Sequence, residues 1–272
     1  MLIAQITDPH IKLPGKLAYK RVDTAQMLRD CVATVRSLKQ PPDLILMTGD
    51  LVDLGSPEEY EHLRSILAPL RQRIVVIPGN HDARDALCEA FRDGGYLPET
   101  GFLQFVIEDE YPLRIIGLDT VVAGEGRGEL CTQRLKWLDD ALARAPDTPT
   151  LIMMHHPPFD TGIGHMDAIG LTGKGEFAAI MMRHAQVELI LCGHLHRAIR
   201  ATVGGRPALC CPSPAHQVAL DIDPNAPSAF RMEPPGFMLH WWSGTGLVTH
   251  TATVGQYDGP YPFFDASGRL ID

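Results

Sequence analysis

Side chains that can bind metal ions occur in five short clusters along this chain, and each cluster directly follows an apolar run. The clusters read TDPH, TGDLVD, PGNHD, MMHHPP and CGHLH. Imidazole nitrogens together with carboxylate and amide oxygens are the ligand mixture that borderline and hard divalent cations accept. A metal site assembled from several loops is therefore the first chemistry that the sequence indicates.

The apolar runs before these clusters are short enough to be buried strands. They are predicted at residues 2–7, 44–48, 73–78, 113–119, 150–154 and 188–192. Helical patterns separate them: residues 28–38 carry an apolar face, Ser56 and Pro57 fit the N-cap and first position of one helix, and Thr132 fits the N-cap of another. This alternation predicts an α/β fold with a largely parallel sheet covered by helices.

Ligands of open α/β sheets bind at the carboxyl ends of the strands, which is where all five clusters fall. Each cluster alone has a structural explanation, since TDPH could be a turn before Pro9 and GNHD could be a type I′ turn. A lone histidine near a strand end is also usually hydrogen-bonded within the fold. So many buried ionisable groups at one place, however, would be unstable without a cation.

Composition narrows the classes of partner. The net charge of -9, with no basic run, argues against a nucleic-acid polymer as partner. No apolar window approaches the length of a membrane helix, and the N-terminus lacks the charged region and cleavage site of a signal peptide. The six cysteines form no CxxC pair and mostly sit in apolar segments, so we expect buried reduced thiols, no membrane partner and a cytoplasmic protein.

The character of the sequence changes after residue 195. Short segments between glycine and proline turns predict antiparallel strands at residues 198–203, 207–211, 216–222, 237–242 and 246–254. Aromatic residues gather in FMLHWW and YDGPYPFFD, where they could complete the core or form a subunit contact. We expect a homo-oligomer.

The motifs D-x-H, G-D-x-x-D, G-N-H-D, H-H and G-H-x-H, in this order, resemble those of the calcineurin-like metallophosphoesterases. The resemblance spans residues 3 to about 200 and is closest to the class III cyclic nucleotide phosphodiesterases and the bacterial glycerophosphodiesterases. It implies a four-layer αββα sandwich, with a catalytic domain over residues 1–214. Residues 215–272 would form a C-terminal antiparallel extension that caps the site or makes oligomer contacts.

The same resemblance implies two divalent metal ions per chain, of Mn, Fe, Zn or Co, bridged by Asp50. One ion would be bound by Asp8, His10, Asp50 and His196, and the other by Asp50, Asn80, His155 and His194. His156 would lie beside the ligands, and the choice between His155 and His156 rests on the resemblance alone. Asp53 stands where purple acid phosphatases carry a ligating tyrosine, which disfavours a tyrosinate-ferric site.

The implied activity is hydrolysis of small phosphodiesters by in-line attack of a metal-bridging hydroxide. The first substrate class is 3′,5′-cyclic nucleotides such as cAMP, with glycerophosphodiesters or 2′,3′-cyclic nucleotides as the alternatives. Two other functions are disfavoured. A non-enzymatic scaffold without working metals would not need this complete ligand set, and a DNA nuclease would need a basic groove that the acidic chain does not offer.

Asp50 and His81 are the expected catalytic residues, and Asn80, His81 and His216 the expected substrate-binding residues. His81 resembles the family's non-ligand histidine near the substrate phosphate, where it would stabilise the transition state or protonate the leaving group. Asp82 could orient His81, or it could cap a helix that begins at Ala83. The glycine-rich loop at residues 162–170, with His165 and Asp167, should border the pocket.

Overall fold

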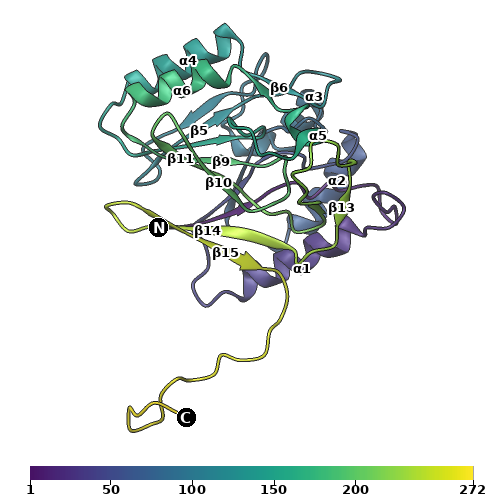
Figure 1. Cartoon of the computed structure of the whole chain (residues 1–272), viewed down its shortest axis with the longest axis vertical. Coiled ribbons are helices and arrows are strands. Elements are labelled where there is room, and N and C mark those ends of the chain that lie inside the picture. Colours follow the sequence, from purple (N-terminus) through teal and green to yellow (C-terminus); the bar gives the residue numbers. More distant parts are fainter. Residues whose placement is uncertain (272) are drawn as a thin grey trace.

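The computed structural model describes residues 1–271, which form two packed β-sheets with helices on both outer faces (Figure 1). The first sheet has the order β15-β14-β1-β2-β3. Its strands are β1 (Leu2–Ile6), β2 (Leu44–Met47), β3 (Arg73–Val76), β14 (Gly236–Trp242) and β15 (Leu247–Thr253). Strands β1, β2 and β3 are parallel, and the β14–β15 hairpin pairs antiparallel with β1.

The second sheet has the order β10-β11-β9-β7-β5-β4. Its strands are β4 (Phe105–Ile107), β5 (Arg114–Leu118), β7 (Thr150–Met154), β9 (Val187–Cys192), β10 (Ile199–Val203) and β11 (Arg206–Cys210). Strands β5, β7, β9 and β11 are parallel, whereas β4 and β10 are antiparallel edge strands.

Helices cover the outer face of each sheet (Figure 1). Those of the first sheet are α1 (Thr24–Ser37), α2 (Pro57–Leu67) and α3 (Arg84–Ala90), and those of the second are α4 (Thr132–Ala143) and α6 (Lys174–Arg183). Shorter elements lie in the connections: η1 (Arg92–Gly94), α5 (Gly164–Asp167), the pair β6 (Gly128–Glu129) with β8 (Leu171–Thr172), and the pair β12 (Gln217–Val218) with β13 (Phe230–Arg231).

The side-chain alternation of the buried strands explains the four layers. In β1, Ile3 belongs to the core between the two sheets, together with Leu44 of β2 and Leu151 of β7. The neighbouring residues Ala4 and Ile6 point the other way and pack under the helices. A strand that is apolar on both faces needs a cover on both, so the αββα sandwich expected from the sequence is confirmed.

Two expectations for helix starts have different outcomes. Ser56 caps α2 as predicted, in a capping box with Glu59, and Pro57 is the first helical residue. The prediction for Thr132 was wrong: the cap of α4 is Cys131, which holds the extended backbone conformation, and Thr132 is already helical. The α4 cap therefore has no side-chain hydrogen bond.

The prediction that the strands after residue 195 are all antiparallel is wrong for one of them, β11 (Arg206–Cys210). Strand β10 takes the edge of the second sheet, and the turn at residues 204–205 brings β11 back beside β9, so that β11 runs parallel to β9. Of the strand predicted at residues 216–222, only Gln217–Val218 forms a strand, β12.

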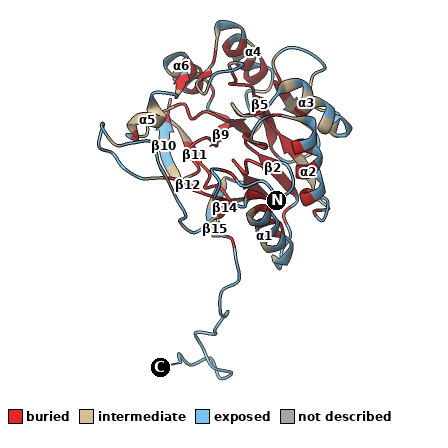
Figure 2. Ribbon diagram, turned by 90° about the vertical axis from the view of Figure 1, so that its right-hand side faces the viewer, coloured by how far each residue is buried: buried red, intermediate tan, exposed pale blue. Residues whose placement is uncertain are grey.

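Strands β14 and β15 complete the first sheet, and Phe237 is buried in its outer core. The β14–β15 hairpin, residues 236–253 of the predicted C-terminal extension, is therefore continuous with the first sheet, and a role of the extension in capping or oligomer contact stays a prediction. Residues 255–271 run away from the body and are exposed (Figures 1 and 2).

All six cysteines are free thiols, and four of them are buried. Within residues 1–271, no helix combines the length and apolar character needed to cross a membrane.

Candidate metal centre

The five clusters meet at the carboxyl ends of parallel strands from both sheets. Strand β1 is followed by Asp8 and His10, β2 by Asp50, β3 by Asn80, β7 by His155, and β9 by His194 and His196. Asn80 is half-buried and the other six are buried. The structure thus brings all seven predicted ligands to one place.

The first predicted ligand set is compact. The Nε2 atom of His10 lies 3.2 Å from His196 Nε2 and 3.5 Å from Asp50 Oδ2. The Nε2 atom of His196 lies 3.5 Å from Asp8 Oδ1. Ligand atoms of Asp8, His10 and His196 fall within 4.8 Å of one another, so one cation could contact them together.

The second predicted set shares Asp50 with the first. The Nε2 atom of His155 lies 3.4 Å from Asp50 Oδ2 and 3.1 Å from Asn80 Oδ1. The His194 ring lies 5.1 Å from the His155 ring, and its Nε2 atom is buried with no hydrogen-bond partner among the described residues. An unpaired buried ring nitrogen fits a metal ligand, because such an atom is otherwise unfavourable.

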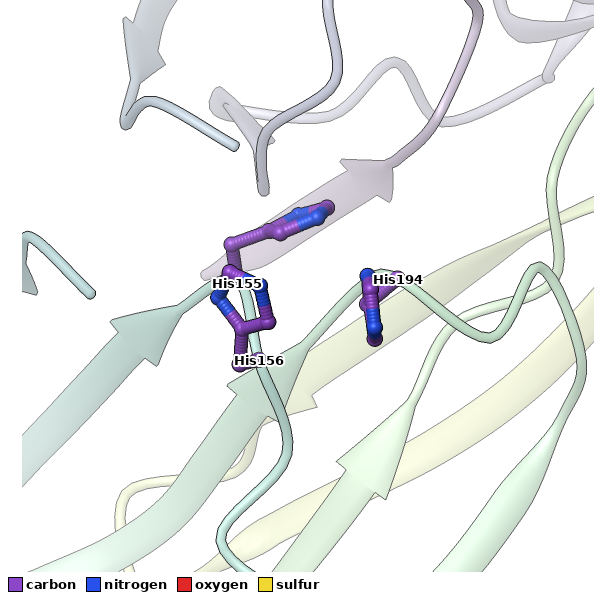
Figure 3. A group of neighbouring side chains, drawn as sticks. All are labelled: His155, His156 and His194. Atoms are coloured by element: carbon purple, nitrogen blue, oxygen red, sulfur yellow. The ribbon is translucent and has the colours of Figure 1, made fainter. Parts of the chain in front are cut away.

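The structure distinguishes His155 from His156. Figure 3 shows both just beyond the end of one strand, with His194 beyond the neighbouring strand. The Nδ1 atom of His155 lies 2.9 Å from the Thr48 carbonyl, which only accepts, so Nε2 carries the lone pair that faces Asp50. Both nitrogens of His156 are engaged, Nδ1 at 2.8 Å from the Thr120 hydroxyl and Nε2 at 3.0 Å from the Gly126 carbonyl. His156 therefore has no free lone pair for a cation.

Other contacts hold the first set in orientation. His196 Nδ1 lies 3.0 Å from the carbonyl of His216, which leaves His196 Nε2 facing Asp8. Asp8 accepts hydrogen bonds from the Thr7 hydroxyl at 2.6 Å and from the backbone N–H of His194 at 3.0 Å. Such contacts fix the orientation of a metal-binding side chain, and the tautomer of a histidine, before a metal ion binds.

The backbone at these positions is strained. The φ angles are +52° at Asp8, +44° at His10, +48° at Asp50, +68° at His194 and +54° at His196. These are five of the eight non-glycine residues with positive φ in residues 1–271. Strain of this kind is typically stored at functional sites.

The charges of the buried cluster depend on one another. Burial raises the pKa of Asp8 to about 6, although His155 opposes the rise. Burial also favours a neutral His155, but Asp50 and Asp8 raise its pKa to about 10. The pKa values of His194 and His196 are lowered, mainly by burial. Metal binding at such a site displaces protons, because the ligands must be deprotonated.

The family model for calcineurin-like phosphoesterases matches residues 1–198. The chain belongs to this family. This phosphoesterase is 42% identical over 274 residues to "Probable glycerophosphodiester phosphodiesterase GpdQ" of Arcobacter nitrofigilis, with 100% of each chain covered. It is 33% identical over 211 residues to the Escherichia coli "3',5'-cyclic adenosine monophosphate phosphodiesterase CpdA", covering 78% of this chain and 75% of the relative.

Among solved structures, a dimetal phosphatase from Danio rerio matches with a TM-score of 0.65 and 14% identity, covering 94% of this chain and 99% of that one. That likeness supports the fold. From its family and its relatives, the protein is a metal-dependent phosphodiesterase.

The ligand cluster of this phosphoesterase opens into a cavity of about 370 Å³. The predicted substrate-binding residues Asn80, His81 and His216 line it, as does His165 of the glycine-rich loop. Asp167 of the same loop does not line the cavity. Its carboxylate accepts hydrogen bonds from the backbone N–H groups of Thr161 and Gly162 and so stabilises the loop conformation.

Sequence reasoning missed the aromatic wall of this cavity. Tyr19 and Phe230 line it, with ring centroids 5.0 Å apart, and both pack near the His216 ring at 5.2 Å. Met166 and Ile169 of the glycine-rich loop add apolar side chains to the cavity lining.

Both roles considered for Asp82 were wrong. Its Oδ2 accepts from the N–H groups of Gly79 and Leu51, at 2.8 and 3.1 Å, and its Oδ1 accepts from the Tyr60 hydroxyl at 2.7 Å. Helix α3 begins at Arg84 and has no side-chain cap. Asp82 therefore ties the loops after β2 and β3 together.

Proposed function

We propose that this phosphoesterase hydrolyses small phosphodiesters with two divalent metal ions, and that glycerophosphodiesters are its preferred substrates. The observation that carries the proposal is the position of Asp50, whose Oδ2 lies 3.5 Å from His10 Nε2 and 3.4 Å from His155 Nε2. One carboxylate oxygen thus lies between the two ligand sets. The residues that would hold the ions are Asp8, His10, Asp50, Asn80, His155, His194 and His196.

The ions would supply a water of lowered pKa as nucleophile and would neutralise phosphate charge; Mn, Fe, Zn and Co all suit these ligands. The chain's own residues orient the reaction. The Nδ1 atom of His81 donates to the carbonyl of Asp53 at 2.8 Å, and the ring lines the cavity, so Nε2 is the nitrogen available to the substrate. From there, His81 would bind a phosphate oxygen or transfer a proton to the leaving alcohol.

Two observations support glycerophosphodiesters over cyclic nucleotides. The relative named as a probable glycerophosphodiester phosphodiesterase is 42% identical over the whole chain, whereas a relative named as a probable cyclic nucleotide phosphodiesterase is 35% identical over 96% of it. The Tyr19 and Phe230 rings, 5.0 Å apart, leave no room to sandwich a nucleobase, which needs aromatic planes about 7 Å apart. Cyclic nucleotides such as cAMP, ranked first from the sequence, thereby become the second candidate.

A homo-oligomer and a cytoplasmic location remain part of the proposal. The exposed aromatic residues Tyr257, Tyr261, Phe263 and Phe264 beyond β15 support a subunit contact. The free cysteines support a reducing compartment.

A substrate panel tests the proposal. Protein reconstituted separately with Mn²⁺, Fe²⁺, Zn²⁺ and Co²⁺ would be assayed with glycerophosphoethanolamine, glycerophosphocholine, 3′,5′-cAMP, 2′,3′-cAMP and a phosphomonoester. We expect the highest kcat/KM for a glycerophosphodiester. A higher kcat/KM for 3′,5′-cAMP would restore the original ranking, and preference for the monoester would refute diester hydrolysis as the function.

A further inference from the structure

We propose that Lys12 and Asp53 position His10 and thereby set the affinity of the metal ion bound by the first ligand set. The inference rests on the ligand assignment of the proposed function. Lys12 and Asp53 act through His10, so both are positioning residues.

The two nitrogens of His10 have different surroundings. Nε2 faces His196 and Asp50, as a metal ligand would. Nδ1 is buried and has no hydrogen-bond partner within residues 1–271; the carboxylate oxygen nearest to it is Asp53 Oδ1, at 3.6 Å. A ligating histidine needs an acceptor for its second N–H, and Asp53 is placed to provide it.

Asp53 is held from several directions. Its Oδ2 forms an ion pair with the ammonium group of Lys12. Its backbone N–H donates to the Ile11 carbonyl at 3.1 Å, and its carbonyl accepts from His81. Burial disfavours the charged carboxylate, but His10 and Lys12 hold the pKa of Asp53 below its usual value.

The backbone of Lys12 is anchored in turn. Its carbonyl accepts from His62 Nδ1 of α2 at 2.7 Å, and His62 Nε2 lies 3.3 Å from the guanidinium of Arg29 in α1. This contact fixes the Lys12 backbone, and the ion pair with Asp53 restrains its side chain. Its ammonium group keeps the partly exposed carboxylate of Asp53 turned inward, because without it solvent would compete for that carboxylate.

Two other roles for Asp53 fit the structure less well. Ligand atoms of His10, Asp53 and His81 lie within 4.8 Å of one another, but the Lys12 ammonium on Asp53 opposes a further cation there. Asp53 also contacts His81 through its backbone carbonyl, so its carboxylate is left to serve His10.

Calorimetric titration of metal-free protein with Mn²⁺ tests the inference. Asp53→Asn should weaken one of the two binding steps about 10- to 100-fold and spare the other. Lys12→Met should weaken the same step by about 2- to 5-fold, the effect expected from losing a partly exposed ion pair, because Lys12 acts through Asp53. Lys12→Arg should restore wild-type affinity. The control Lys16→Met removes an exposed lysine of the same loop and should change neither step.

A double variant separates positioning from general loosening. If Lys12 acts through Asp53, adding Lys12→Met to Asp53→Asn should weaken binding no further. The inference would be overturned by additive losses of Mn²⁺ affinity in the double variant, by equal weakening of both binding steps, or by wild-type affinity of Lys12→Met. None of these results would contradict the proposed function. A wild-type protein that binds a single Mn²⁺ at saturation would overturn the ligand assignment, and the inference with it.

Discussion

His240 should make the protein less stable in mild acid. It is fully buried in β14, with Nε2 3.1 Å from Gln5 Oε1 and Nδ1 2.8 Å from the Thr249 hydroxyl. Gln5 Oε1 accepts the Nε2 proton, and Nδ1 accepts from Thr249, so the neutral ring is fully satisfied. Burial lowers the pKa of His240 to about 3.

The sign and size of the effect follow from proton binding. Between pH 3 and 6.5, His240 binds a proton in the unfolded chain but not in the folded protein. Its contribution to the free energy of unfolding is therefore complete above pH 6.5 and is lost as the pH falls below that value. With an unfolded pKa of about 6.5, this one residue should lower the free energy of unfolding by about 2 kcal/mol between pH 7 and pH 5.

Urea unfolding of metal-free protein at pH 7 and pH 5 measures this loss. His240→Gln removes the titrating group, so its loss over this range should be about 2 kcal/mol smaller than that of the wild type. Thr249→Val keeps the buried histidine and should keep the wild-type pH dependence, whatever its effect on stability. Equal pH dependence in the wild type and His240→Gln would refute the reasoning.

Further predictions concern the site and the tail. Asp50→Ala should reduce kcat more than Asn80→Ala under excess metal, because Asp50 lies between both ligand sets and Asn80 carries no charge; near-wild-type turnover of Asp50→Ala contradicts its bridging role. Elemental analysis of metal-loaded protein should find two ions per chain. In Gly193→Ala the new Cβ would lie 2.8 Å from Asp8 Oδ2, so Mn²⁺ affinity should fall, while Gly175→Ala meets no atom within 4 Å and should bind normally. Removal of residues 255–272 should lower the molar mass measured by light scattering if the tail joins subunits; an unchanged mass would remove that role.

The strands and the ligand clusters could be predicted because they obey local rules. Each buried strand is a short apolar run, and a polar residue such as Asp8 or Asp50 directly after it falls at the sheet edge where ligands bind. The capping box at Ser56 and Glu59 is equally local. These features need no knowledge of distant parts of the chain.

The cavity walls and the positioning residues could not be predicted in this way. Tyr19 and Phe230 meet only because the loop after β1 and the short β12–β13 pair fold over the same opening. Lys12, two residues after a predicted ligand, resembles any solvated lysine until its contact with Asp53 is known. Asp82 bonds to three groups of the loops and helix around it, which a local capping rule does not reveal.

The strained backbone of the predicted ligands is the feature least visible in the sequence, and it explains how two neighbouring histidines come to lie in different predicted ligand sets. In an extended chain, residues two apart point to the same side, so His194 and His196 would face one ion together. Their φ angles of +68° and +54° turn the chain instead, and His196 Nε2 lies beside Asp8 and His10 while the His194 ring packs against His155. Each such residue costs about 1–2 kcal/mol, and hydrogen bonds such as His194 N–H to Asp8 hold the conformation. The packed sandwich thus holds a loop conformation that separates the two predicted ligand sets.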